Sequence, residues 1–182
     1  MQPGRCEHVT VAGAARYLLG GCMLAAVLLF PVQGHTTDKF RDFKLRNLAG
    51  DTVRFDDVRG DVTLIAFFFP TCPYCNKALP ITVKLFEKYR GQGLAMAWIN
   101  VVEEEEDAVP GWLAGNGYEG ITVLVGASQQ YLARRYDIMF TPEHLILDPD
   151  RVILYRQRGY EAGYENELED HIRLALDLQA AQ

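Results

Sequence analysis

An uncharged run of eight residues followed by two closely spaced cysteines limits the fold more than any other feature of the chain. The run, Val62 to Phe69, lies between Gly60 and Pro70, and Cys72 and Cys75 come directly afterwards. A strand with apolar side chains on both faces lies inside a sheet that helices cover on both sides. The sequence therefore predicts a layered α/β domain whose cysteine pair follows a central strand.

Strand-like and helix-like segments alternate along the rest of the chain. The expected strands are residues 40–48, 52–55, 62–69, 94–102, 121–125, 143–147 and 152–157. The expected helices follow Cys75, cover residues 107–118, start after the capping residue Ser128, and close the chain around residues 168–176. Two pairs of these strands are joined by short turns, which indicates antiparallel hairpins. The pattern predicts a mixed central sheet flanked by helices, with an N-terminal β-hairpin extension.

The first 34 residues form a separate segment that is typical of an export leader. The apolar run Tyr17 to Val32 is shorter than the roughly 20 residues that span a bilayer. We predict that residues 1–34 are a signal peptide cleaved near Gly34, and that residues 35–182 form a single domain. Two alternatives remain open: an uncleaved membrane anchor, and lipidation at Cys22, which follows residues that resemble a lipobox.

Composition excludes several classes of protein. The net charge of -6 leaves no excess of positive charge with which to hold nucleic-acid phosphates, so we expect no nucleic-acid partner. The chain has four cysteines, and Cys6 and Cys22 belong to the leader. Only Cys72 and Cys75 remain, which is too few for a disulfide scaffold.

The spacing of Cys72 and Cys75 is suited to thiol–disulfide exchange. At the first turn of a helix, free backbone N–H groups and the helix dipole favour a negatively charged sulfur. We therefore expect Cys72 to be the nucleophile, and Cys75, one turn later, to resolve the mixed disulfide. Pro73 fits this turn because its missing N–H has no helical partner to lose.

Two other uses of the cysteine pair are less favoured. Zinc needs about four ligands, and outside the leader the sequence offers no second cysteine pair and only His35, His144 and His171. An inert structural disulfide that closes so short a loop would stabilise the fold little, because the entropic term grows with loop length.

With these motifs in order, the chain resembles the TlpA/ResA-like exported thiol:disulfide oxidoreductases of the thioredoxin superfamily. The resemblance runs from about Phe40 to Leu176, nearly all of residues 35–182. It rests on the opening hairpin, the Cys-Pro-Tyr-Cys motif, Pro80 in the following helix, and Phe140-Thr141-Pro142 before the next strand. The chain departs from the family in having Thr71 where most members have tryptophan, and a Pro-Tyr dipeptide as in glutaredoxins.

The resemblance implies a thioredoxin-like fold and an enzyme, a protein-disulfide reductase that works outside the cytoplasm, in the periplasm or a similar compartment. It implies that the redox-active disulfide of Cys72 and Cys75 replaces any cofactor. The partners it implies are protein disulfides, with apocytochrome c in cytochrome c maturation as the context, and a membrane thiol electron donor of the DsbD/CcdA type.

The resemblance also assigns roles near the cysteines. It makes Glu103 an active-site glutamate that exchanges protons with them, and we expect Glu103 to be partly buried while the other three glutamates of the run matter little. It implies a cis Thr141–Pro142 bond. Substrate would then contact Pro73, Tyr74, Thr141 and Pro142.

Two rival functions use the same residues. In a Sco-like copper-delivery module, His144 would join the two thiols as a ligand, but Sco-type proteins space their cysteines by three residues rather than two. A peroxiredoxin-like peroxidase needs a threonine or serine four residues after the proline of its signature. With that proline at Pro70, the position holds Tyr74.

Overall fold

The computed structural model describes residues 38–118 and 120–181, so the leader, anchor and lipidation hypotheses for residues 1–34 lie outside the described residues. The described part forms a seven-stranded mixed sheet in the order β2-β1-β5-β4-β3-β6-β7. Its strands are β1 (Leu45–Asn47), β2 (Thr52–Val53), β3 (Val62–Phe68), β4 (Leu94–Asn100), β5 (Thr122–Val125), β6 (Glu143–Leu147) and β7 (Ile153–Arg158). Strands β3, β4 and β5 are parallel, and the remaining neighbours pair antiparallel.

The described part of the chain also contains four α-helices and three short 3-10 helices. The α-helices are α1 (Cys75–Tyr89), α2 (Val109–Asn116), α3 (Gln129–Tyr136) and α4 (Tyr164–Ala180). The 3-10 helices are η1 (Phe55–Asp57), η2 (Arg90–Gln92) and η3 (Glu103–Ala108). None of the helices in the described part is long and apolar enough to cross a membrane. The predicted mixed sheet, flanking helices and N-terminal hairpin are all confirmed, although the first hairpin strand is only Leu45–Asn47.

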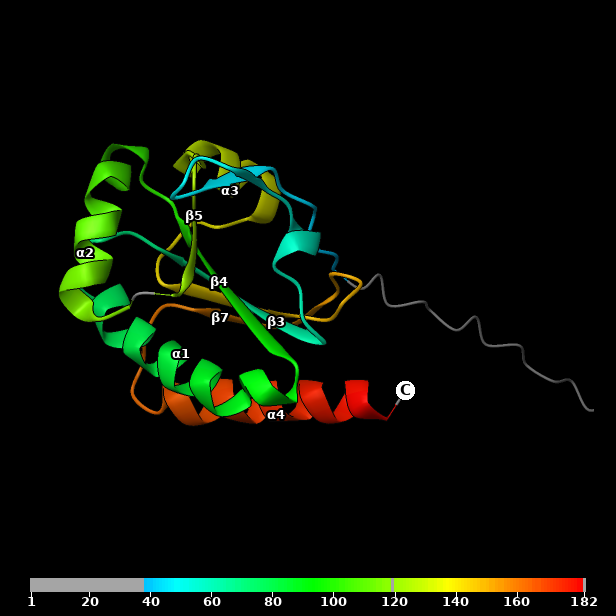
Figure 1. Cartoon of the computed structure of the whole chain (residues 1–182). Helices are drawn as coiled ribbons and strands as arrows, with labels where there is room; N and C mark the ends of the chain where they lie inside the picture. The colour runs from blue at the N-terminus through cyan, green and yellow to red at the C-terminus, as the bar shows by residue number, and fades with distance from the viewer. Residues whose placement is uncertain (1–37, 119, 182) are drawn as a thin grey trace, which may run out of the picture. The chain divides into compact units, whose positions relative to one another are not determined.

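The central strand β3 is buried on both faces, as its uncharged sequence predicts. Leu64, Ala66 and Phe68 belong to a core layer with α1, α2 and α4, while Ile65 and Phe67 belong to the opposite layer with α3 and the N-terminal segment. Successive side chains on a strand point to opposite faces, so one continuous apolar run serves both layers. Figure 1 shows α1 and α4 on one side of the sheet and α3 on the other.

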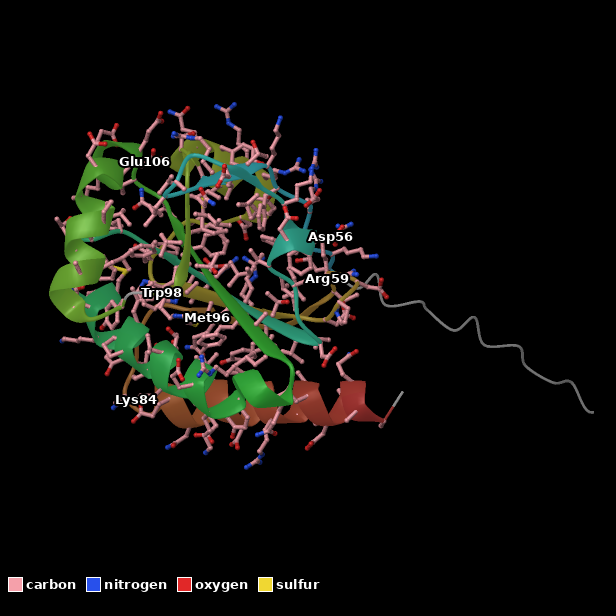
Figure 2. All side chains as sticks on the ribbon, in the orientation of Figure 1. Asp56, Arg59, Lys84, Met96, Trp98 and Glu106 are labelled. Atoms are coloured by element: carbon pink, nitrogen blue, oxygen red, sulfur yellow. A yellow bond between two sulfur atoms is a disulfide. The ribbon has the colours of Figure 1, made fainter. Side chains whose placement is uncertain are left out.

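The neighbouring strand β4 has the same two-sided burial. Its side chains Met96 and Trp98 lie inside the core, whereas Lys84 of α1 points to solvent (Figure 2). Strands β3 and β4 are parallel and pair in register from Val62 with Leu94 to Phe68 with Asn100. Their carboxyl ends therefore lie side by side, which brings the segment after Phe68, with both cysteines, beside the segment after Asn100, with the glutamate run.

Candidate active site

Cys72 and Cys75 form a disulfide at the amino end of α1, with their Cα atoms 5.2 Å apart. Cys75 is the first residue of α1, and Cys72 lies in the turn before it. The backbone N–H of Cys75 donates a hydrogen bond of 3.1 Å to Sγ of Cys72. Amides at a helix start have no partner within the helix. This amide is therefore placed to stabilise negative charge on the Cys72 sulfur once the disulfide is reduced.

The two cysteines differ slightly in exposure. Cys72 is 2% exposed and Cys75 is 0% exposed. Both cysteines are buried, and the small exposure that remains belongs to Cys72. The direction of this difference agrees with an attack by Cys72 and resolution by Cys75, and these two roles stay predictions.

A loop from the other half of the chain lies beside Cys72. The Thr141–Pro142 peptide bond is cis, as expected, and Oγ1 of Thr141 lies 3.8 Å from Sγ of Cys72. The loop comes directly before β6, which pairs antiparallel with β3. The sheet register thus brings together two segments that are 69 residues apart.

Large apolar side chains surround this pair of segments at the surface. Tyr74, Met139 and Phe140 are 57%, 61% and 67% exposed. Two hollows adjoin them: one of about 330 Å³ lies between Tyr74, Thr141 and the segment 158–161, and one of about 490 Å³ lies between Phe140, Thr141 and α3. Exposed apolar patches of this kind mark surfaces that bind other molecules. Substrate contact by Pro73, Tyr74, Thr141 and Pro142 stays a prediction, and the surroundings of Tyr74 and Thr141 are compatible with it.

Glu105, in η3, is hydrogen-bonded to the turn before Cys72. Its carboxylate accepts hydrogen bonds from the backbone N–H of Thr71 over 3.0 Å and from the Thr71 hydroxyl over 2.6 Å. Thr71 is the position where most members of the resembling family carry tryptophan. No sequence pattern marks this contact, because four consecutive glutamates give no signal that distinguishes one from another.

Asn76 supports the same turn from α1. Its side-chain amide donates to the carbonyl of Pro70 over 3.3 Å, and its side-chain carbonyl accepts from the indole N–H of Trp112 over 3.2 Å. Trp112 in turn packs against Phe68 with ring centroids 5.2 Å apart. The cysteine turn is thereby fixed to the core through α2. The sequence offers no pattern that marks this contact.

Comparison with known families decides which group of proteins shares this arrangement. Residues 36–156 match the AhpC/TSA family over two thirds of the chain, a span that includes both cysteines and the Thr141–Pro142 loop. The chain belongs to the AhpC/TSA family. Within it, the resemblance to TlpA/ResA-like proteins and the thioredoxin-like fold are both confirmed by the relatives and solved structures described next.

Three relatives of this AhpC/TSA protein illustrate the likeness. Protein DipZ of Mycobacterium bovis is 28% identical over 122 residues, which are 66% of this chain but 17% of DipZ. Thiol-disulfide oxidoreductase ResA of Halalkalibacterium halodurans is 28% identical over 64 residues, which are 35% of this chain and 36% of ResA. A Chlorobium tepidum crystal structure, assigned as thiol:disulfide interchange protein DsbE, is 26% identical with a TM-score of 0.68 and covers 77% of this chain and 96% of its own. This chain thus spans a small part of DipZ and about a third of ResA.

The expected position of Glu103 in this AhpC/TSA protein is wrong. Its side chain is exposed rather than partly buried. Residues 103–108 form the 3-10 helix η3, in which successive side chains point in different directions. Glu105 therefore points toward Thr71, and Glu106 binds Arg46 and the backbone N–H of Gly126. That the other glutamates of the run matter little for the reaction stays a prediction, although Glu105 and Glu106 both form hydrogen bonds with distant segments.

His144 lies in the core and not at the surface. It is fully buried on β6, and its ring nitrogens lie 3.0 and 3.2 Å from the hydroxyl of Tyr164 on α4. Burial lowers the pKa of His144 from 6.5 to about 3. Across residues 38–118 and 120–181, no three side chains of His, Cys, Asp or Glu are grouped to hold a metal ion. The copper site formed by Cys72, Cys75 and His144 is therefore not assembled.

Glu143, directly after Pro142, anchors the start of β6. It is fully buried, and its Oε1 accepts a hydrogen bond of 2.5 Å from Arg156 and lies 3.6 Å from Nε of Arg158. Burial raises the pKa of this carboxyl more than the two arginines lower it. The ion pair ties the Thr141–Pro142 loop to β7, so it positions the residue that contacts Cys72.

Proposed function

We propose that the protein is an exported thiol:disulfide oxidoreductase that reduces disulfides in other proteins. One observation carries the proposal: the Cys72–Cys75 disulfide lies at the amino end of α1 with Thr141 beside the Cys72 sulfur. The exposed apolar side chains around it provide a surface for a protein substrate. The relatives ResA and DsbE carry names of the same reaction class.

The proposed reaction needs only the two cysteines. In the reduced protein the Cys72 thiolate attacks a substrate disulfide, which forms a mixed disulfide and releases one substrate thiol. The Cys75 thiol then loses its proton and attacks Cys72, which releases the second substrate thiol. The substrate gains two electrons and two protons, and the protein returns to the disulfide form. Electrons then re-enter from a second thiol partner, so no prosthetic group is required.

The proposal also includes a cell compartment, a substrate and an electron donor. Residues 1–34 read as a leader or anchor, which supports action in the periplasm or another extracytoplasmic compartment. Apocytochrome c is proposed as a substrate and a membrane thiol protein of the DsbD/CcdA type as the electron donor. Both follow from the TlpA/ResA resemblance.

A trapping experiment tests the proposal. Reduced Cys75→Ser protein is expected to accumulate a stable mixed disulfide with insulin, because nothing resolves the Cys72 bond. The Cys72→Ser variant is the matched control and should form none. If Cys72→Ser traps the substrate and Cys75→Ser does not, the two roles are reversed; if neither variant traps it and the wild type reduces no insulin, the proposed activity is wrong.

The equilibrium potential of the pair decides the direction of the reaction. A value near or below about -250 mV supports a reductase, and one above about -180 mV points to an oxidase or isomerase. Consumption of hydrogen peroxide by the reduced wild type, without insulin reduction, would select the peroxidase alternative instead.

A further inference from the structure

Positive charges gather along α3, although the whole chain carries a net charge of -6. A hollow of about 410 Å³ follows this helix, and three arginines line it: Arg41, Arg134 and Arg135. Ser128, Gln130 and Tyr131 complete its lining. We call this hollow the α3 basic groove.

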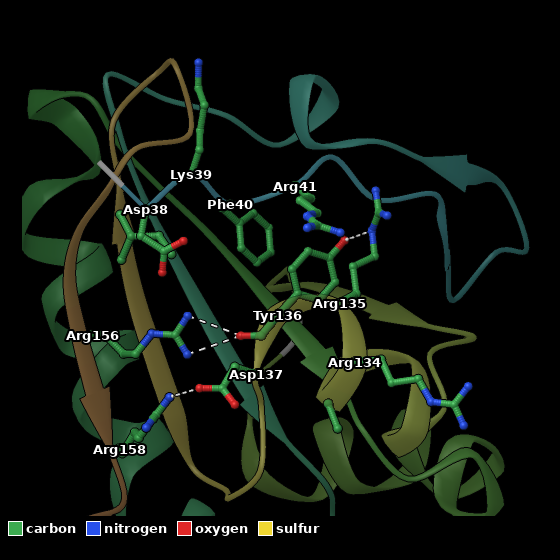
Figure 3. A pocket seen from close by; sticks show the side chains of 12 residues that line it. Asp38, Lys39, Phe40, Arg41, Arg134, Arg135, Tyr136, Asp137, Arg156 and Arg158 are labelled. Atoms are coloured by element: carbon green, nitrogen blue, oxygen red, sulfur yellow. Dashed lines mark hydrogen bonds and ion pairs between the residues drawn. The ribbon is translucent and has the colours of Figure 1, made fainter. Parts of the chain in front are cut away.

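The arginines of this region differ in whether their charge is balanced. Arg156 and Arg158, in the larger hollow next to the groove, are paired with Glu143 and Asp137. Arg135 donates to two uncharged acceptors, the Tyr136 hydroxyl and the backbone carbonyl of Asp42, and the nearby Asp42 carboxylate is already paired with Arg54. Figure 3 shows these bonded arginines beside Arg41 and Arg134, which carry no dashed line.

Arg41 and Arg134 are exposed, and their side chains form no hydrogen bond or ion pair with the described part of the chain. Together with Arg135 they place three positive charges in one groove without a carboxylate partner in its lining. Such a concentration of one sign attracts ligands of the opposite sign and raises their rate of association.

The groove lies next to a hollow that borders the active site. Gln130 lines both the α3 basic groove and the apolar hollow of about 490 Å³, whose lining also includes Thr141. Thr141 contacts Sγ of Cys72. The α3 basic groove therefore adjoins an apolar hollow whose lining reaches the residue beside the reactive sulfur.

Acidic side chains limit the groove on one side. Glu103 and Glu104 line a neighbouring hollow that also includes Ser128 and Gln130. These carboxylates repel an acidic segment at the amino end of α3, so the arginines near its carboxyl end are the favoured contact. The larger hollow beyond them includes Asp38 and Asp137, and Asp137 is already bound to Arg158.

We propose that the α3 basic groove binds an acidic segment of the protein substrate whose cysteine reacts with Cys72. An apolar residue between that cysteine and the acidic residues would occupy the hollow beside Phe140 and Thr141. This inference rests on the proposed disulfide reductase function and adds the chemical class of its substrate. Charge complementarity of this kind acts mainly on the rate of encounter and on the choice of partner.

Three cyclic peptides test the inference on the reduced full-length protein. All have the same intramolecular disulfide and the same apolar residue, and they differ only in three flanking residues, which are aspartate, asparagine or lysine. The three peptides carry these residues on the amino side of the reacting cysteine, and a second series of three carries them on its carboxyl side, so that both directions of the bound chain are tested. We expect the aspartate peptide to be reduced about tenfold faster than the lysine peptide at low salt, and the difference to vanish near 1 M salt.

The double variant Arg41→Gln with Arg134→Gln identifies the residues responsible. It should lose the preference for the aspartate peptide and still reduce the asparagine peptide at the wild-type rate, which also shows that it is folded. Lys84→Gln is the matched control, because Lys84 is an exposed cation on α1, away from the groove (Figure 2). This control should keep the full preference.

The outcomes separate this inference from the function on which it rests. Equal rates for the three peptides overturn the groove assignment and leave the reductase function intact. Reduction of none of them overturns the function itself. Binding to vesicles of anionic lipid that is lost in the double variant, with no peptide preference in the wild type, overturns the proposal in favour of a membrane surface.

Discussion

Glu143 and His144 are consecutive residues on β6, both fully buried, and their side chains lie on opposite faces of the sheet. Glu143 is paired with two arginines that reach partly into solvent. His144 contacts the hydroxyl of Tyr164 and has no charged partner among its hydrogen bonds. One face of the sheet therefore accommodates a charge below the active-site loop, and the other face admits only a neutral polar pair.

This difference follows from what covers each face. On the α3 side, Arg156 of the edge strand β7 lies between Glu143 and the backbone carbonyl of Tyr136 at the end of α3, and its side chain keeps partial contact with solvent. The α1 and α4 side is closed by two long helices that pack apolar residues on the sheet. A buried charge is tolerated only where it is paired, so the two faces should respond differently to substitution and to pH.

The largest effect is expected from Glu143→Ala. Removing this buried side chain leaves Arg156 without its acceptor and opens a cavity, which costs about 3 kcal/mol of unfolding free energy. Chemical denaturation measures the loss. Asp137→Asn is the control, because it removes an exposed partner of Arg158 and should cost about 0.5 kcal/mol or less. Equal losses in the two variants would contradict the contrast between buried and exposed pairs.

The second effect is a loss of stability in mild acid caused by His144. The unfolded chain binds a proton on this histidine as the pH falls below about 6.5, whereas the folded protein resists it until the pH approaches about 3. Stability should therefore fall by roughly 1.4 kcal/mol per pH unit within this window, or about 2 kcal/mol between pH 6.5 and 5. Denaturation curves at several pH values test this, and His144→Phe should flatten the slope.

Two variants sharpen the pH experiment. His171→Gln removes the histidine that stacks on Tyr155 and controls for the loss of one histidine.

Glu143 acts in the opposite direction, because its raised pKa lets the folded state bind a proton before the unfolded state does. Stability from Glu143 therefore increases as the pH falls toward 4.5, so Glu143→Gln should make the acid loss steeper. A shallower slope would contradict this sign.

A smaller effect is expected from Tyr164→Phe. The variant removes the hydroxyl that satisfies the buried His144 ring, at a cost of about 1 kcal/mol. Tyr160→Phe is the matched control, since Tyr160 packs on Tyr164 and its hydroxyl forms no hydrogen bond with residues 38–118 or 120–181. Thermal denaturation of both variants checks the difference. A Tyr160→Phe loss as large as that of Tyr164→Phe would contradict it.

The smallest effects are expected in the glutamate run. Glu105→Ala removes both bonds to Thr71, and we expect about a twofold change in the alkylation rate of reduced Cys72, which corresponds to about 0.4 kcal/mol. Glu103→Ala should leave that rate unchanged at every pH from 5 to 9. If the pH profile of Glu103→Ala differs from that of the wild type, Glu103 exchanges protons with the cysteines in spite of its exposed position.

Much of the fold follows from patterns that the sequence shows directly. The uncharged run of β3 predicts a strand covered on both faces, and Ser128 caps α3 as expected by accepting from the N–H of Tyr131. The hairpin of β6 and β7 follows from alternation around a turn. These signals are local, because they depend on residues within one element or one turn.

In the candidate site, too, local sequence signals mark some residues and not others. Cys72 and Cys75 could be found from their spacing and from their place between a strand and a helix. Only the family resemblance favours Glu103 over Glu105, and no sequence pattern marks the support from Asn76. Both contacts depend on where one residue of a 3-10 helix or an α-helix points, which a change of a single position reverses.

The amino-acid sequence by itself determined the layered α/β fold, the redox cysteine pair and the acidic overall charge, because periodicity, spacing and composition are properties of the chain. The tertiary structure decided which distant residues meet: Thr141 at Cys72, Glu105 at Thr71, and Arg41 beside Arg134 along α3. The physical reason is that sheet register and helix rotation set these contacts, and both result from the packing of the whole core rather than from any one segment.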